Sequence, residues 1–567
     1  MIFKRSKANK NTLDNAEKIL RNELFVHSAW PTVKIGKVTW KEDPYNDITW
    51  CFYLHSLDIV GYLMLAYEIN PNKEYLEKAK YFIGSWVKTN PTKKDQVSPF
   101  AWKDHSVANR VVNIIHFWQH YKDSDIYDES FANLIIRTLI KHGDYLEDDR
   151  HHTFINNHGI FQDRSLIELA VLFPDLPNSE KWYEKAINRF MVHVKKDVSP
   201  SGVHLEHSGA YHIVVMNLFR SINDFLKFHN KETTKLSDLI IKMEDYLAYL
   251  VKPDGKIPIT GDSGPDGITY LNEDIISNPK LLYTRTKGRS GIQPYDDIVY
   301  TDAGIAIFRS NWSFNDRQLY LKFIAGFHSR THKHADDLSV LLSIGKTDFL
   351  VDSGKYNYQE KNPYRRYFRS TMAHNTVTVN RKSYEIEDEQ VGKSKIISFS
   401  YNEEYSHVSG IHTLYPGVKI KRTILYLKQS EAVLIFDEIT SLKLRTYSQI
   451  FNIGKDVNTS KITKKNILLD SILDGKTIEL IQLNHVTEFK QYKGNDEPIF
   501  GWQSSVFNKK YPITQIQFSN KGTDLEYRTI INTNIDNGIK YFSTKKIKGK
   551  TTFTITNKNN ERLKITI

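Results

Sequence analysis

Two short segments of the chain concentrate side chains that could transfer protons. Residues 151–159 contain three histidines and the pair Asn156 and Asn157, and residues 203–212 contain five titratable groups: His204, Glu206, His207, Tyr211 and His212. Imidazoles, phenols and carboxylates act as general acids and bases, and an amide can neutralise a substrate charge through hydrogen bonds. Two polar loops that cap helices are the alternative interpretation. The favoured interpretation is a site built from an amide, a phenol and imidazoles.

A second group of donors indicates a metal. His332 and His334 are two residues apart, so both side chains point to the same side of an extended backbone. Asp352 ends the next apolar run, and His374 precedes another. A His/Asp/His set from adjacent strands suits zinc or another divalent transition metal, with surface histidines as the alternative.

The elements that would position these groups begin with helices. Apolar residues recur at helical spacing, and breakers such as Asn70-Pro71 and Asn90-Pro91 separate the segments. We expect helices at 13–24, 50–67, 76–87, 105–119, 130–146, 164–173, 183–194, 212–229 and 236–250. An all-α array of helical hairpins is therefore predicted for about residues 11–250.

The second half of the chain has the period of β-strands. Pro and Gly cluster between about residues 251 and 300, where we place a domain junction. Beyond it, apolar residues alternate, as in Leu319, Leu321 and Phe323. The predicted fold class is a multidomain protein with an α domain followed by an antiparallel β-sandwich.

One motif in the junction resembles a known active-site segment. Gly261-Asp262-Ser263-Gly264-Pro265 is similar to the nucleophile segment of trypsin-like proteases, but helical segments precede it where such a protease has a β-barrel. We interpret it as an interdomain turn.

Composition and charge restrict the partners. The 567 residues carry 78 basic and 66 acidic side chains, a formal net charge of +12, which favours an anionic partner such as an acidic glycan, nucleic acid or a membrane surface. The single cysteine, Cys51, excludes an intrachain disulfide framework. The longest apolar stretch, 59–67, is far below the roughly 18 residues of a membrane span. No signal peptide is visible after Met1, so we expect a cytoplasmic protein, with a periplasmic or secreted one as the alternative.

Several motifs, in the same order along about residues 50–440, resemble the signature blocks of the heparinase II/III-like polysaccharide lyases. They are Ala101-Trp102 with Asn109-Arg110, Asn156-Asn157-His158-Gly159, Glu206-His207-Ser208 with Tyr211-His212, Asp302-Ala303-Gly304 before Phe308-Arg309, His332-Lys333-His334-Ala335-Asp336, and Arg369-Ser370-Thr371-Met372-Ala373-His374-Asn375-Thr376-Val377. The resemblance implies an incomplete (α/α) toroid followed by an antiparallel β-sandwich. We expect a helical extension at 1–40, the toroid at 41–285 and the sandwich at 286–567.

The resemblance also implies an activity and the residues that perform it. The expected reaction is β-elimination on a uronic-acid polysaccharide or oligosaccharide, such as heparan sulfate, hyaluronan, chondroitin or a bacterial uronan, which leaves an unsaturated uronic acid. Asn157 matches the amide that neutralises the uronic carboxylate, Tyr211 the acid, and His332 the base for opposite-face elimination. By the same resemblance His334, Asp352 and His374 would hold a structural metal, commonly zinc.

Further residues are candidates for support or substrate binding. His158, Glu206, His207 and His212 belong to the matched motifs. Trp102 and Arg110 would line the substrate groove or, equally, pack between helices. Arg365 and Arg369 would contact anions, or lie in a solvated turn.

Other functions stay open on the sequence. A glycoside hydrolase on a similar toroid would use two carboxylates, for which Asp163 and Glu206 could be proposed. A non-catalytic anionic-glycan binding protein would need the groove but not Tyr211 or His332. Nucleic-acid binding would rest on charge alone, so no nucleic-acid partner is expected. The oligomeric state, monomer or dimer, is left open.

Overall fold

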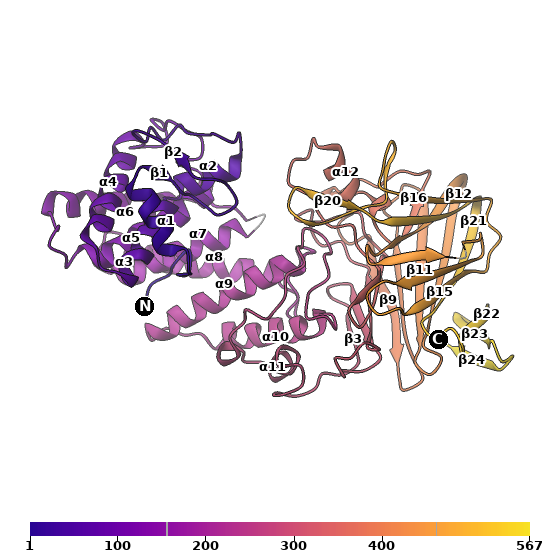
Figure 1. The fold of residues 1–567 in the computed structure, drawn as a ribbon. Coiled ribbons are helices and arrows are strands. Elements are labelled where there is room, and N and C mark those ends of the chain that lie inside the picture. Colours follow the sequence, from indigo (N-terminus) through magenta and orange to yellow (C-terminus); the bar gives the residue numbers. More distant parts are fainter. Residues whose placement is uncertain (155–156, 461) are drawn as a thin grey trace. The chain divides into compact units, whose positions relative to one another are not determined.

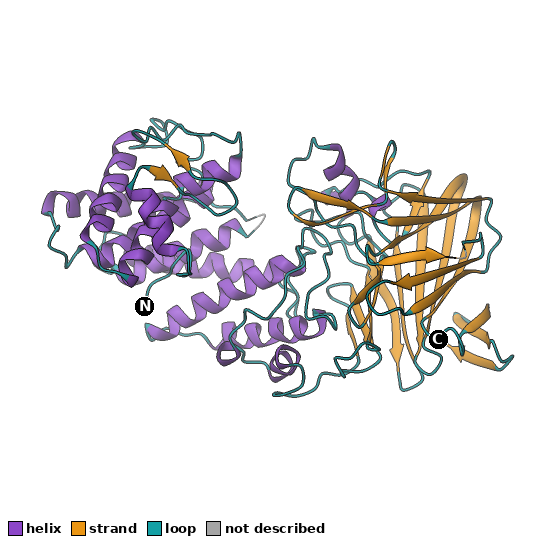
Figure 2. Cartoon of the chain, viewed as in Figure 1, coloured by secondary structure: helices purple, strands orange, loops and turns teal. Residues whose placement is uncertain are grey.

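The structure is a computed structural model that describes residues 1–154, 157–460 and 462–567, so Asn156 of the second motif lies outside the described residues. The chain divides into two compact units. Unit 1 is Met1–Lys196 with Leu218–Thr234, and unit 2 is Asp197–Asn217 with Lys235–Ile567. Unit 1 consists mainly of helices, and unit 2 contains the large sheets (Figure 1, Figure 2).

The helices follow the expected series closely. They are α1 (Thr12–Leu20), α2 (Ile48–His55), α3 (Asp58–Ile69), α4 (Lys73–Thr89), α5 (Asp104–Tyr121), α6 (Glu129–Glu147), α7 (His158–Leu172), α8 (Ser179–Asp197), α9 (Gly209–Phe228), α10 (Thr234–Leu250), α11 (Pro279–Thr286) and α12 (Pro363–Arg369). Polar side chains begin several of them: Asn72, Asp128 and Asn278 accept hydrogen bonds from backbone N–H groups in the first turns of α4, α6 and α11. These caps satisfy donors that have no partner within the helix.

One expected helix, at 50–67, is two helices in the structure. The backbone of Leu57 is left-handed, with φ 58°, and separates α2 from α3. The break frees backbone carbonyls, which buried side chains of α5 bind: Arg110 Nη1 donates to the His55 carbonyl at 2.6 Å and Asn113 Nδ2 to the Ser56 carbonyl at 2.9 Å. A periodic pattern cannot reveal this break, because the apolar period continues through it.

Helix α5 is the centre of unit 1. It packs against α3, α6 and α7, and its apolar side chains, such as Val107, Val111 and Ile115, are buried. Burying one such side chain contributes about 1.5–3 kcal/mol. Consecutive helices, such as α3 and α4 or α6 and α7, also pack against one another, as expected for an all-α array.

Unit 2 contains a 15-stranded antiparallel sheet. Its strands are β3 (Asp297–Tyr300), β4 (Ile305–Arg309), β5 (Leu319–Ile324), β6 (Val340–Ile344), β7 (Thr347–Leu350), β8 (Val377–Val379), β9 (Ser394–Tyr401), β10 (Tyr405–His412), β11 (Val418–Leu427), β12 (Ala432–Ile453), β13 (Val457–Ser460), β14 (Asn466–Ser471), β15 (Thr477–Gln482), β16 (Glu488–Lys493) and β21 (Thr514–Asn532). Small sheets in unit 2 are formed by β17 (Asn495–Asp496) with β18 (Ile499–Phe500), β19 (Trp502–Val506) with β20 (Lys509–Pro512), and β22 (Ile539–Ile547) with β23 (Lys550–Asn557) and β24 (Arg562–Thr566). In unit 1, β1 (Glu23–Leu24) pairs with β2 (Val33–Lys34).

Two long strands organise these layers. β12 and β21 pair along most of their length, and β12 also pairs with β11, β7 and β8. One core is formed by residues of the 15-stranded sheet and its loops and includes Phe323, Leu342 and Phe451. A second core joins β11 and β12 to the β22–β24 sheet. The predicted order of a helical part followed by an antiparallel β part is confirmed, whereas the domain limits 1–40, 41–285 and 286–567 stay a prediction.

Polar side chains within the sheet hold the loops that carry the candidate site. Buried Arg422 pairs with Asp437, Nε to Oδ1 at 2.6 Å, and donates through Nη1 to the carbonyls of Leu338 and Asn375. Asn375 in turn donates from Nδ2 to the carbonyls of Val340 and Val351, at 2.8 and 2.9 Å. The segments that contain His334, Asp352 and His374 are therefore tied together.

Candidate active site

The side chain of Tyr211 lies against His332. Tyr211 is in the first turn of α9, where Ser208 Oγ accepts its backbone N–H at 3.3 Å, so a serine cap sets the start of the helix. The phenol and the imidazole are stacked, with ring centroids 3.5 Å apart and an angle of 17° between the rings. The structure thus brings together the two residues expected to act as acid and base.

His332 is oriented by carboxylates on both of its nitrogens. Its Nδ1 lies 2.9 Å from Asp262 Oδ2, and its Nε2 lies 3.5 Å from Glu206 Oε2. A neutral imidazole that donates from Nδ1 to Asp262 keeps a lone pair on Nε2, which can accept a proton. The nearby Glu206 carboxylate then stabilises the imidazolium.

Asp262 is the central anion of the site, and sequence reasoning missed it. Besides His332 it binds His334, Nε2 to Oδ1 at 3.0 Å, and the Arg365 guanidinium on both oxygens, at 2.6 and 3.1 Å. Burial alone would raise the pKa of the Asp262 carboxyl, but hydrogen bonds from His332, His334 and Arg365 hold it well below its ordinary value. The Gly261-Asp262-Ser263 motif is the signal in the sequence, although its Gly- and Pro-rich surroundings by themselves indicate only a turn.

The Tyr211 hydroxyl has a phenolic neighbour. It lies 3.1 Å from the hydroxyl of Tyr358, to which Lys355 Nζ donates at 3.2 Å. Burial raises the pKa of the Tyr211 phenol, so it carries its proton at neutral pH. The phenol is therefore suited to donate a proton.

Backbone contact fixes the spacing of the loops around the site. Gly261 has φ +56°, and a Cβ placed on it would lie 2.5 Å from the His207 carbonyl oxygen and 2.9 Å from that of His332. Any other residue would clash with both neighbouring loops. The loop with His207, the loop with Asp262 and the loop with His332 touch at this glycine.

A group of metal donors lies beside these residues. Side-chain donor atoms of His334, Asp352 and His374 lie within 4.8 Å of one another, and all three side chains are buried. His374 Nδ1 is 2.9 Å from Asp352 Oδ2, while His334 Nδ1 and His374 Nε2 are buried without a hydrogen-bond partner. The two unpartnered imidazole nitrogens, together with the Asp352 carboxylate, could hold a metal ion. β12 aligns the group, because β7, before Asp352, and β8, after His374, both pair with it.

The supporting residues predicted in unit 2 lie around the same centre. His207 Nε2 accepts the backbone N–H groups of His328 and Ser329, at 3.2 and 3.4 Å, and so holds the start of the His332 loop. His212 Nε2 lies 2.9 Å from the Met243 carbonyl, and burial lowers its pKa to about 4, which leaves it neutral. Both histidines therefore position backbone segments.

The two predicted arginines differ in exposure. Arg365 is buried and forms an ion pair with Asp262, so its charge is balanced within the protein and not by a substrate anion. Arg369 Nη1 pairs with Glu360 Oε2 at 2.6 Å and keeps a partly exposed guanidinium, with 24% of its side chain accessible. Of these two, Arg369 is the one that a substrate anion can reach.

The other candidates belong to unit 1. Asn157 is a buried residue directly before α7 and accepts the Ile160 N–H on its carbonyl at 3.1 Å. His158 Nδ1 lies 3.4 Å from Asp104 Oδ2. Trp102 and Arg110 are both buried, with the Arg110 guanidinium 3.7 Å from the ring centroid of Trp86, as expected for helix packing.

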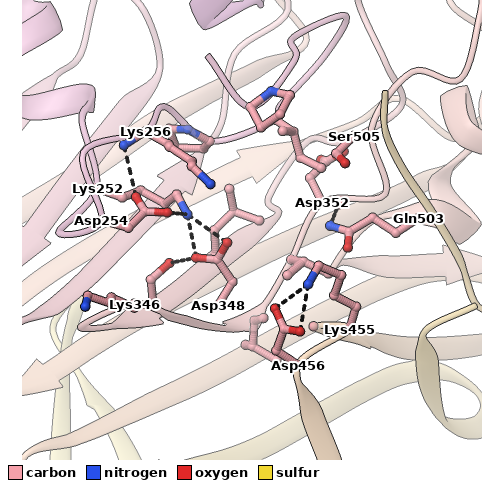
Figure 3. Close-up of a pocket in the computed structure, with 18 of the residues that line it drawn as sticks. Lys252, Asp254, Lys256, Lys346, Asp348, Asp352, Lys455, Asp456, Gln503 and Ser505 are labelled. Atoms are coloured by element: carbon pink, nitrogen blue, oxygen red, sulfur yellow. Dashed lines mark hydrogen bonds and ion pairs between the residues drawn. The ribbon is translucent and has the colours of Figure 1, made fainter. Parts of the chain in front are cut away.

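A separate cavity of about 480 Å³ lies in unit 2 (Figure 3). Its charged walls are largely paired: Lys252 lies 2.7 Å from Asp348, and Lys455 lies 2.6 Å from Asp456. Asp352 lines it, whereas Tyr211 and His332 do not. The balanced charges give this cavity no preference for an anionic sugar.

Comparison with known proteins places this geometry in a family. The family model described as heparinase II/III N-terminus matches residues 3–281, and that described as heparinase II/III-like, C-terminal, matches residues 292–553. The chain belongs to the heparinase II/III family. A heparin-sulfate lyase of Pedobacter heparinus is 22% identical over 496 residues, which are 85% of this chain and 74% of that protein. One of Bacteroides stercoris is 22% identical over 551 residues, 89% of this chain and 78% of its own.

Solved structures agree on the fold of the heparinase II/III family. A crystal structure of heparinase III superimposes with a TM-score of 0.84 at 16% identity, covering 100% of this chain and 93% of that one. A chondroitin AC lyase of Streptomyces coelicolor follows with a TM-score of 0.58 at 8% identity, covering 96% and 84%. The predicted fold class is confirmed, and the protein is a polysaccharide lyase of this family.

Among the described residues, no single helix has the length and apolar composition of a membrane span. Helices α2 and α3, which meet at a bend of 54°, have that length and composition only when they are taken together.

Proposed function

We propose that this lyase cleaves a heparan-sulfate-type glycosaminoglycan, or an oligosaccharide of it, by β-elimination at a uronic acid. The observation that carries the proposal is the stacked pair of Tyr211 and His332 beside the Asp262 carboxylate. A hydrolase would need two carboxylates across the scissile bond, and has no use for a paired phenol and imidazole. Both relatives named above are heparin-sulfate lyases, which supports this substrate class before other uronans.

The reaction requires three functions from the protein. A base removes the C5 proton of the uronic acid, the electron pair forms the C4–C5 double bond, and the C4–O4 bond breaks as an acid protonates the leaving oxygen. The C5 proton becomes acidic enough only when the charge on the neighbouring carboxylate is neutralised. The new non-reducing end is an unsaturated uronic acid.

We assign the base to His332 and the acid to Tyr211. His332 Nε2 is the acceptor because Nδ1 faces Asp262 at 2.9 Å. Burial raises the pKa of Tyr211, so the phenol carries its proton at rest and can give it to the leaving oxygen. Where both steps occur on one face of the sugar, Tyr211 would serve as base as well. The assignment of Asn157 to charge neutralisation rests on its motif.

Zinc is the metal that we propose for His334, Asp352 and His374. A zinc ion bound there would cross-link the three loops that contain these residues. The chain's own residues then hold His332, because His334 and His332 share the Asp262 carboxylate. Elimination needs no open metal position, so the role is structural.

Replacing His334 by alanine tests this site. We expect the zinc content of the purified protein to fall by about one equivalent per chain, and the melting temperature to fall with it, because metal binding stabilises the folded state. Elemental analysis and thermal unfolding measure the two effects. The exposed residue His485 provides a control variant, His485→Ala, with unchanged values. Unaltered metal content in His334→Ala would remove this residue as a ligand.

Ultraviolet absorbance tests the function itself, because elimination leaves a conjugated double bond. The protein is mixed separately with heparan sulfate, heparin, hyaluronan, chondroitin sulfate and alginate. We expect the absorbance to rise with heparan sulfate first. New reducing ends without absorbance would establish hydrolysis instead, and a rise only with another polymer would transfer the proposal to that substrate.

A further inference from the structure

Helices α3 and α5 of unit 1 carry three metal donors that have no part in the lyase site. His116 and His120 are one turn apart on α5, and Glu68 is near the end of α3. Both imidazoles contact the same carboxylate oxygen: His116 Nε2 lies 2.9 Å and His120 Nε2 lies 3.3 Å from Glu68 Oε1. The three donor atoms lie within 4.8 Å of one another.

This spacing is close to that of a metal complex. Ligand bonds of about 2.1 Å in a tetrahedral site place the donor atoms about 3.3 Å apart. The two nitrogen–oxygen distances of 2.9 and 3.3 Å therefore need little change to admit an ion. Histidines four positions apart on one helix face are a recurrent zinc-binding spacing. Imidazole donors select zinc-type ions over calcium or magnesium.

The group is open to water on one side. The His116 side chain is 2% exposed, whereas His120 and Glu68 are 24% and 26% exposed. One ligand is thus fixed by packing, and the other two border solvent, which gives an ion a path of entry and leaves positions for water. Lys4 competes for the same carboxylate, with its Nζ 2.7 Å from Glu68 Oε2 and its side chain 40% exposed.

Another His/Asp/His group of unit 1 is less suitable. Among the described residues, His152, Asp163 and His193 also place donors within 4.8 Å, and all three are buried. Arg189 Nε already lies 3.0 Å from Asp163 Oδ1, so the carboxylate has its counter-charge. A divalent ion would add uncompensated charge to a buried place, which is costly.

We propose that Glu68, His116 and His120 form a second metal site, which binds Zn²⁺ or a similar divalent transition ion with water in the remaining positions. Lys4 is its internal competitor: the ion replaces the Lys4 ammonium as the cation on Glu68 and cross-links α3 to α5. The proposal is independent of the substrate and of the group at His334.

Calorimetric titration of Zn²⁺ into the purified protein, with all 567 residues present, tests the site. Compared with wild type, His120→Ala should bind Zn²⁺ at least about 10- to 100-fold more weakly, because losing a ligand costs no less than losing a residue that supports one. Lys4→Met should bind it more tightly, because the competing cation is gone. His485→Ala is the matched control, and Ca²⁺ the control ion.

The outcomes separate the site from its alternatives. An isotherm of His120→Ala equal to that of wild type would overturn the site, and an unchanged affinity in Lys4→Met would overturn the competition. His120 is partly exposed, so the variant should keep the melting temperature of the zinc-free protein; the variant Glu68→Gln, which keeps the side-chain shape, must show the same weakening. Retained tight binding in Glu68→Gln would also contradict the proposal.

Discussion

Tyr211→Phe is expected to lower kcat by about 10²–10⁴-fold, the usual contribution of a positioned acid. The variant loses the hydroxyl group alone, and the ring that stacks on His332 at 3.5 Å stays in place. We therefore expect substrate affinity and melting temperature close to those of the wild type. Absorbance kinetics, direct binding measurements and thermal unfolding check the three quantities.

A tyrosine remote from the site provides the comparison. Tyr541 in β22 is 47% exposed, so Tyr541→Phe should retain the turnover of the wild type. If Tyr211→Phe turned over substrate at the wild-type rate, Tyr211 would have no part in proton transfer. If Tyr211→Phe lowered the melting temperature markedly as well as the activity, the result would assign Tyr211 a structural role.

Asp262→Asn should impair turnover and stability together. The amide cannot balance the charge of Arg365, which is 3% exposed, and leaving one partner of a buried ion pair costs about 3–5 kcal/mol. It also removes the anion that holds Nδ1 of His332, so we expect kcat to fall by about 10²–10⁴-fold. Denaturant unfolding and absorbance kinetics measure the two effects.

A second variant separates these effects. In Asp262→Asn combined with Arg365→Met, the buried cation disappears with its partner, so most of the stability should return. Turnover should not return, because His332 still lacks its anion. Full activity in either variant would show that Asp262 does not position the base.

Much of the fold could be predicted from the sequence, because periodicity reports burial directly. The helical stretches and the change to a period of two near residue 300 both appear in the structure as expected. The division of 50–67 into α2 and α3 could not be predicted, because the break at Leu57 depends on Arg110 and Asn113, which are more than 50 residues away.

We expected the side chains of His332 and His334 to point to the same side because an extended backbone places them there. The side chains do converge, but the backbone is not extended. Both side chains contact the same carboxylate, His332 at Oδ2 and His334 at Oδ1 of Asp262. His332 itself lies in a turn with φ 55°. Alternation along a strand therefore does not explain the arrangement, and the shared carboxylate does.

Asp262 itself illustrates the limit of sequence reasoning. It is 70 residues before His332 and 103 before Arg365 in the chain, within a Gly- and Pro-rich segment typical of turns. No local pattern indicates that a loop carboxylate becomes buried among three cationic or imidazole groups. Only the folded backbone, which brings these loops together, identifies it.

The contact at Gly261 has a consequence for engineering. Backbone atoms of three loops meet there, so this one contact does not depend on which side chains the loops carry. A library that aims to change substrate preference can therefore vary the partly exposed Arg369 without touching this contact, and should keep Tyr358, whose hydroxyl lies 3.1 Å from that of Tyr211. Residue 261 should be left out of such a library, since every substitution there would push the reacting groups apart before selectivity could be measured.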